Sequence, residues 1–169
     1  TLRWLASPHS PVPALVGRLT GIGQAIEQPV RTPASLADFK EGQTFSLLIE
    51  HPAGRVLIHG SAAVADGGLR GVTADVVFLG IATLIKQPLA VQRDYLRQVV
   101  LNTGARLVVP VHWDDFTRSA EGGLVAMPYL VDDLVAGLRF LDAELATQAG
   151  VALHLLPMGG QVVLGGPAR

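Results

Sequence analysis

The residues best suited to chemistry lie in the segment 108–116, VVPVHWDDF, where His112, Asp114 and Asp115 follow an apolar run. The β-branched residues of that run predict a buried strand, so the imidazole and both carboxylates would emerge where the strand leaves its sheet. Open α/β sheets bind ligands at such edges, and imidazole with carboxylate suits a metal ion or general acid–base catalysis. The structural alternative is a buried, hydrogen-bonded His112 with both aspartates capping the next turn.

His9 is a second candidate because it follows a predicted strand and lies between two prolines, in the sequence Ser-Pro-His-Ser-Pro. Prolines on both sides stiffen the backbone and would hold the imidazole toward a ligand. The alternative is an exposed loop histidine.

Ser61 follows another predicted strand, in the sequence His-Gly-Ser-Ala-Ala. It could act as a nucleophile with His112 and an aspartate, but that turn normally carries glycine two positions to either side, where His59 and Ala63 stand. A tight strand exit built from small residues is the other interpretation. His59 would face the same side as Ser61 in a regular strand, which makes it a candidate for the pocket.

Composition narrows the classes of function. The chain has 169 residues, 49% of them hydrophobic and 16% charged, with a formal charge of −1 and no cysteine. The 13 basic residues are spread along the chain, which argues against binding of nucleic acid or of an acidic membrane surface. No apolar run is long enough to span a bilayer. Without cysteine, any metal must be held by histidine and carboxylate.

The length fits one α/β domain over residues 1–169. Helices are expected at 89–103, ended by Gly104, and from residue 130 to an end at Gly150, together with a long loop over 9–41 that holds a short helix near 35–39. A hairpin turn is expected at 52–54, and the excess apolar surface would face a buried sheet or another chain, including a second copy. Strands are expected at residues 2–6, 44–50, 55–59, 75–80 and 106–111, with short closing strands at 151–155 and 162–164.

The first residues, Thr-Leu-Arg-Trp-Leu-Ala, read as the middle of a strand, with neither an initiator methionine nor a signal peptide. We therefore expect a fragment, or a chain whose first part was removed. Absence of cysteine fits the cytoplasm, while the missing start leaves a periplasmic or secreted origin open.

The order of these motifs resembles the C-terminal half of the metallo-β-lactamase superfamily. A strand-end histidine is followed by a hairpin ending in Gly60-Ser61, by the apolar strand DVVFLG at 75–80, and by PVHWDDF at 110–116 after a helix. The resemblance covers about residues 2–115. Within it, the segments DVVFLG and PVHWDDF are most similar to the lactonase-like and phosphodiesterase-like hydrolases of the superfamily. It implies an αβ/βα sandwich of which this chain supplies the C-terminal half, with a mixed sheet, flanking helices and a metal site along one edge.

By this resemblance His9 and His112 are metal ligands, and Ser61 stands where the family has a carboxylate that bridges two metals. A serine hydroxyl is a poor ligand, so one divalent metal is favoured over two, with zinc expected first and manganese or iron as alternatives. Asp114 or Asp115 would orient a ligand or shuttle a proton, and His59 would support the site from behind. The His-x-His-x-Asp-His loop of the family is absent from these 169 residues, so an N-terminal half must complete the site.

The expected function is a metallo-hydrolase whose metal-activated water cleaves an ester, lactone or phosphodiester bond in a small molecule. The isolated chain would be incomplete without its N-terminal half. The first alternative is a catalytically silent member of the same fold, kept as a binding or assembly module. The second is a serine hydrolase that uses Ser61.

Overall fold

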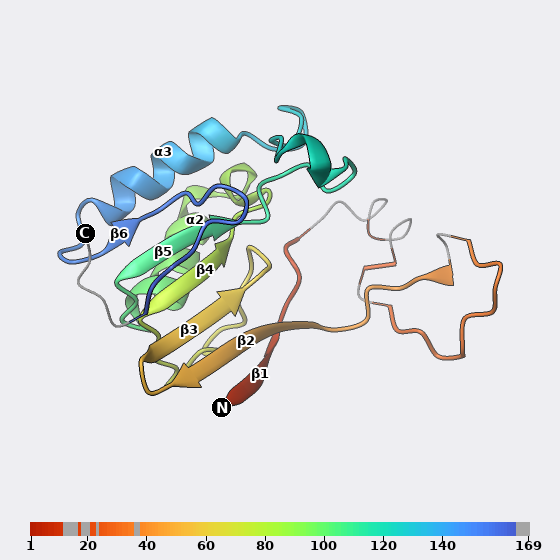
Figure 1. Ribbon diagram of the computed structural model, residues 1–169, viewed down its shortest axis with the longest axis horizontal. Coiled ribbons are helices and arrows are strands. Elements are labelled where there is room, and N and C mark those ends of the chain that lie inside the picture. Colours follow the sequence, from red (N-terminus) through yellow and green to blue (C-terminus); the bar gives the residue numbers. More distant parts are fainter. Residues whose placement is uncertain (12–16, 18–20, 23, 36–37, 165–169) are drawn as a thin grey trace.

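The computed structural model describes residues 1–11, 17, 21–22, 24–35 and 38–164. It has the expected α/β class, with a mixed six-stranded sheet whose strands are neighbours in sequence order (Figure 1). The strands are β1 (Leu2–Ser7), β2 (Thr44–His51), β3 (Gly54–His59), β4 (Val76–Gly80), β5 (Leu107–Val111) and β6 (Ala152–Leu153).

The pairing of the strands decides which of their ends meet. β1, β2 and β3 are antiparallel neighbours, with a tight turn between β2 and β3, whereas β4, β5 and β6 each join the sheet in parallel. Parallel pairs need a longer crossover, which residues 60–75 provide between β3 and β4 and helical segments provide after β4 and β5. As a result β1, β3, β4 and β5 all run the same way, and their C-terminal ends lie along one edge of the sheet.

The helix expected at 89–103 is two consecutive segments, α2 (Leu89–Leu96) and the π-helical η3 (Arg97–Leu101). Gly104 follows with φ +75°, a left-handed conformation that glycine adopts without strain, and it ends the helix as expected. The next helix, α3 (Leu134–Leu145), begins four residues later than expected and ends before the expected end at Gly150. The reason is that the carboxylate of Asp133 accepts a hydrogen bond from the amide of Ala136 at 3.0 Å and caps the helix there.

Two short 3₁₀ helices complete the regular structure, η2 (Leu84–Lys86) and η4 (Ala120–Gly122). The described parts of residues 24–43 extend away from the sheet as a long arm (Figure 1). Two residues of the helix expected at 35–39, residues 36 and 37, lie outside the described residues. Within the described chain no helix has the length and apolar character needed to cross a bilayer.

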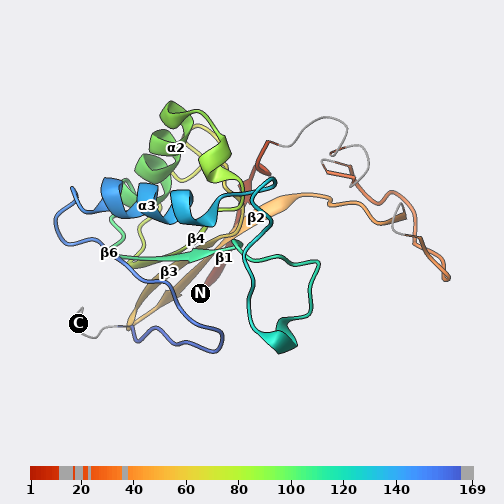
Figure 2. The same cartoon turned by 90° about the horizontal axis from the view of Figure 1, so that it is seen from above.

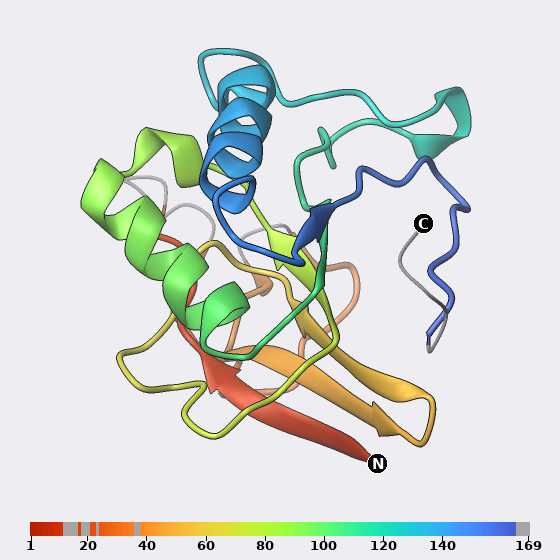
Figure 3. The same ribbon diagram turned by 90° about the vertical axis from the view of Figure 1, so that its left-hand side faces the viewer.

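The two faces of the sheet are covered differently. α2 and α3 pack on one face, whereas the chain that follows β6 passes across the other (Figures 2 and 3). On the helical face alternate strand residues are almost fully buried, as in the cross-strand row formed by Leu48, Leu57, Val77 and Val108. This face holds the main hydrophobic core.

The opposite face carries a smaller cluster in which Val56, Val76 and Val109 are buried. Leu156, Val162 and Leu164 pack against this cluster from the chain that follows β6. The expected strand at 151–155 is shortened to β6, and the one expected at 162–164 is not formed. Val162 and Leu164 pack their side chains against the sheet face without joining the hydrogen-bonded ladder at its edge, while Val163 is exposed.

Candidate functional site

The candidate residues lie along the edge where the parallel strands end. His9 follows β1, Ser61 follows β3 and His112 follows β5. With neighbouring strands about 4.8 Å apart, the axes of β1 and β5 are separated by roughly 19 Å and those of β3 and β5 by roughly 10 Å. His9 and His112 therefore lie at the same edge of the sheet. The distance between their side chains depends on the turns that follow the two strands.

One such turn brings the end of β1 to the end of β3. The amide of Ser10 donates to Oγ of Ser61 at 2.8 Å, and the two hydroxyl oxygens lie 3.2 Å apart. Both serines are buried. The pair therefore ties the chain after His9 to the exit of β3, across the intervening strand β2.

The same turn orients the imidazole of His9. Nδ1 lies 2.7 Å from the carbonyl oxygen of Ser10, which can only accept, so Nδ1 carries a proton and donates. In the neutral ring this leaves the lone pair on Nε2 for another partner. A backbone carbonyl that holds one ring nitrogen in this way is the usual support of a metal-binding histidine.

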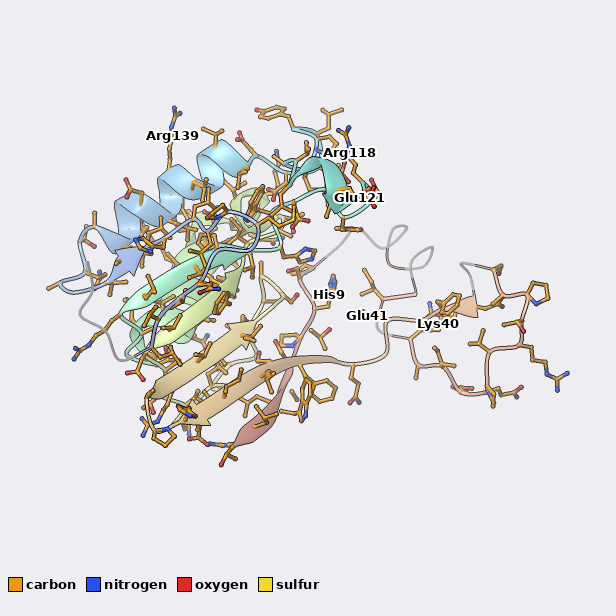
Figure 4. All side chains as sticks on the ribbon, in the orientation of Figure 1. His9, Lys40, Glu41, Arg118, Glu121 and Arg139 are labelled. Atoms are coloured by element: carbon orange, nitrogen blue, oxygen red, sulfur yellow. The ribbon has the colours of Figure 1, made fainter. Side chains whose placement is uncertain are left out.

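Nε2 of His9 faces a carboxylate that the sequence analysis did not single out. It lies 3.9 Å from Oε1 of Glu41, at the base of the arm (Figure 4). That oxygen accepts a hydrogen bond from Oγ1 of Thr44 at 2.7 Å. His9, Glu41 and Thr44 line a cleft of about 420 Å³ together with Ser7 and Gln43, among other residues.

His59 is buried behind this edge, so of its two expected positions the one behind the site agrees with its burial. Its side chain is enclosed at 1% exposure, with Nδ1 2.6 Å from Oγ of Ser46 and Nε2 2.8 Å from the carbonyl oxygen of Ala63. Because that carbonyl only accepts, Nε2 carries the proton and Ser46 donates to Nδ1. Burial lowers the pKa of His59, partly offset by the hydrogen bond to Ala63. The ring is a neutral part of the core, beside Tyr95.

Ser61 is engaged in structural hydrogen bonds. Its hydroxyl contacts Ser10, and its carbonyl accepts from the phenol of Tyr95 at 3.2 Å, which also donates to the carbonyl of Gly80 at 2.8 Å. Burial raises the pKa of Tyr95, so the phenol keeps its proton. Among the described residues no histidine nitrogen is hydrogen-bonded to Ser61, so a nucleophilic serine has no base here.

His112 lies at the end of β5 in a left-handed conformation, with φ +56°. Its side chain is exposed, which is contrary to the alternative of a buried histidine, and its ring lies 5.7 Å from that of Phe116. The next residue, Trp113, packs against the main core. The chain therefore turns at His112, and the imidazole remains accessible. His112 does not line the cleft at His9.

The two aspartates differ in their surroundings. Asp114 pairs as an isolated β-bridge with Ala126. Asp115 caps the next turn, because its Oδ1 accepts from the hydroxyl of Thr117 at 2.6 Å and from its amide at 3.1 Å. The hydroxyl of Thr117 is the main cause that lowers the pKa of Asp115. Asp115 is therefore ionised near neutral pH and suits a role as acceptor more than as proton donor.

Within the described residues no group of three or more His, Asp or Glu side chains lies close enough to hold a metal. The described part of the chain offers the pair His9 and Glu41, and separately His112. The proximity of Glu41 was missed because no motif marks it. The register in which Ser7 pairs with Thr44 brings the two flanking loops together, and local spacing does not reveal that register.

No protein-family model, curated protein or solved structure matches the chain. Function is therefore inferred from the residues and geometry described above.

Proposed function

We propose that this chain is the C-terminal half of a metallo-β-lactamase-like αβ/βα sandwich and forms part of a metal-dependent hydrolase. Its substrate class would be a small molecule with an ester, lactone or phosphodiester bond. The observation that carries the proposal is the single sheet edge at which β1, β3 and β5 end, with His9, Ser61 and His112 directly after them. Histidines at such an edge are suited to hold a metal ion beside a ligand.

The face of the sheet without helices supports a second layer. A cross-strand row of apolar side chains runs over five strands on this face: Trp4, Leu47, Ile58, Phe78 and Val109. Val109 is buried, but Trp4 is 68% exposed and Ile58 37%. Apolar faces of two sheets pack about 10 Å apart in sandwiches. We infer that the N-terminal half supplies the sheet that covers this row.

The proposed metal ligands from this chain are His9 and His112, completed by residues of the N-terminal half. Nε2 of His9 fits the role, because the carbonyl of Ser10 holds its other nitrogen. A bound Zn²⁺, or Mn or Fe in its place, would lower the pKa of a water molecule from 15.7 toward about 7 and so supply hydroxide as nucleophile. Asp115 would accept a hydrogen bond as an anion, and Asp114 remains the candidate for moving a proton.

Metal analysis tests the proposal. The full chain, co-purified with its N-terminal half and without chelator, is expected to carry about one equivalent of transition metal and to hydrolyse nitrophenyl ester, lactone or phosphodiester probes. His112→Ala should lose hydrolysis, whereas His154→Gln, a change at another exposed histidine, should not. Less than about a tenth of an equivalent of any transition metal would contradict the proposal.

A catalytically silent binding or assembly module is the second candidate. Ser61 stands where the resemblance implies a metal-bridging carboxylate, and its hydroxyl is used in a buried hydrogen bond. For this module His112→Ala would leave partner binding intact, while a charge placed at Ile58 on the open sheet face would abolish it. The two proposals are separated by which of these variants loses the biological readout.

A further inference from the structure

We infer that His9 and Glu41 form a divalent-cation site in the cleft between the end of β1 and the start of β2, with Glu41 as the carboxylate ligand that Ser61 cannot be. The inference rests on the proposed function for what the cation does, but the site itself is argued from this chain alone. Nε2 of His9 and Oε1 of Glu41 are 3.9 Å apart. Two ligands at about 2.1 Å from a tetrahedral ion are roughly 3.4 Å apart, so the two side chains would approach each other by about half an ångström to share one ion.

The imidazole is held for this role by a chain of hydrogen bonds. Ser61 accepts from the amide of Ser10, and the carbonyl of Ser10 accepts from Nδ1 of His9. The amide and the carbonyl of Ser10 are therefore both held by hydrogen bonds, the amide by the buried Ser61 and the carbonyl by the half-buried His9. The tautomer that results presents the lone pair of Nε2 to the cleft, on the side of Glu41.

The carboxylate is held in a comparable way. Oγ1 of Thr44 donates to Oε1 of Glu41, and Thr44 is the first residue of β2, paired with the last residue of β1, Ser7. His9 comes two residues after one member of this strand pair and Glu41 three residues before the other. The antiparallel register therefore brings the two side chains to the same place, independently of the arm between them.

The cleft has space and polar groups for an ion with bound water. Its volume is about 420 Å³, and its lining includes Ser7, Gln43 and Thr44. Two protein ligands leave coordination positions for water, for substrate or for residues of the N-terminal half. The competing interpretation is a simple ion pair of Glu41 with a protonated His9, which would need no cation.

Calorimetric titration of the full chain with Zn²⁺, and absorption spectra with Co²⁺, test the site without any activity measurement. We expect one ion to bind, and His9→Asn and Glu41→Gln each to weaken the binding by at least about tenfold. Glu41→Asp, which keeps the carboxylate, should bind more tightly than Glu41→Gln. The matched controls are His51→Asn and Glu50→Gln, a histidine and a glutamate at the opposite end of β2, which should bind as the unchanged chain does.

Three outcomes would overturn the inference. The first is that the chain binds neither ion, and the second is that Glu41→Gln binds as tightly as the unchanged chain. The third is that added Zn²⁺ leaves the NMR resonances of the His9 ring unchanged, which identifies a contact of His9 with Glu41 that holds no ion. Circular dichroism of Glu41→Gln, an isosteric change, confirms that the variant is folded.

Failure of this inference is distinguishable from failure of the proposed function. If ion binding depends on His9 and Glu41 but the assembled protein hydrolyses none of the probes, the site stands and the hydrolase does not. If hydrolysis and metal content depend on His9 and His112 but are unchanged in Glu41→Gln, the hydrolase stands and the role of Glu41 is wrong.

Discussion

The amide of Ser10 donates a 2.8 Å hydrogen bond to the hydroxyl of Ser61, 51 residues away in sequence. The bond joins the exits of two strands that are not neighbours in the sheet, because β2 lies between β1 and β3. It also places Ser61 where it can fix the orientation of His9 through the carbonyl of Ser10. Ser61 thus holds the turn whose carbonyl orients the imidazole of His9.

Ser61→Ala should destabilise the fold, because it leaves the buried amide of Ser10 without its acceptor. The expected loss is about 1–3 kcal/mol in the free energy of unfolding, measured by urea denaturation. Ser119→Ala is the matched control, since its hydroxyl is exposed and its acceptor contact is long, 3.3 Å, so a loss of about 0.5 kcal/mol or less is expected. Equal losses in the two variants would contradict a structural role for Ser61.

A fluorophosphonate probe should leave Ser61 unlabelled. The hydroxyl is buried, and its described hydrogen bonds lead to Ser10 rather than to an imidazole that could remove its proton. Mass spectrometry of the treated chain, compared with treated Ser61→Ala, checks this. Labelling that disappears in the variant would instead establish the serine hydrolase alternative.

Stability should fall as the pH is lowered below about 6.5, the pKa of an unperturbed histidine. Burial lowers the pKa of His59, so in this range the unfolded chain binds a proton at His59 more readily than the folded chain. The contribution of His59 to the free energy of unfolding is fully present above the pKa that His59 has in the unfolded chain. It is lost as the pH falls through the lower pKa of His59 in the folded chain. Urea midpoints between pH 8 and 5 measure the effect.

Replacement of the histidine separates this effect from general acid unfolding. His59→Gln should flatten the pH dependence, whereas His154→Gln, at an exposed histidine, should leave it unchanged. A profile that is the same in both variants would show that other groups cause the loss of stability.

Gly80→Ala should be strongly destabilising. A Cβ at this position would lie 2.4 Å from the carbonyl carbon and oxygen of Gly60 and 2.9 Å from the carbonyl oxygen of His59, all of them backbone atoms. We expect a loss of about 3 kcal/mol or a failure to fold, seen by thermal denaturation. Gly122→Ala, where a Cβ meets nothing within 4 Å, is the control and should stay within about 0.5 kcal/mol. Equal stability in the two variants would mean that the exits of β3 and β4 are farther apart than described.

The exposed part of the sheet face opposite the helices should cause self-association of the chain. Trp4 and Ile58 are exposed there, and exposed apolar sheet faces associate. The double variant Trp4→Lys, Ile58→Lys should shift sedimentation toward the monomer. Leu130→Lys removes an apolar side chain that is 94% exposed but lies outside the sheet, and should not shift it. A monomer at all concentrations would argue against an uncovered interface.

The pattern of the sequence predicted β1 to β5 well, because each is bounded by a strong local signal. DVVFLG reads as a buried strand and forms β4, and the Pro-Ala-Gly turn joins β2 to β3. The start of α3 was misplaced because apolar spacing continues through Leu130, whereas the cap at Asp133 decides where the helix begins. The strand expected at Val162 and Leu164 was wrong for a similar reason. Apolar residues can pack on the face of a sheet without forming a strand of that sheet.

The candidate site was harder to predict than the strands. The local sequence predicted that His9 and His112 each follow the end of a strand. Both strands end at the same edge of the sheet. The contact of His9 with Glu41 depends on the pairing of β1 with β2 across the whole arm, which no local pattern encodes. The burial of His59 likewise depends on Ser46 and Tyr95, which come from other elements.

The position of Trp4 on the open face has a practical use. The chain has two tryptophans, and the other, Trp113, lies next to His112 and packs against the core. Emission from a solvated indole is red-shifted relative to a shielded one, so the fluorescence of Trp4 would move to shorter wavelength when any protein covers that surface. With Trp113 replaced by phenylalanine, this intrinsic fluorophore allows a partner of that surface to be sought by simple mixing, without a label.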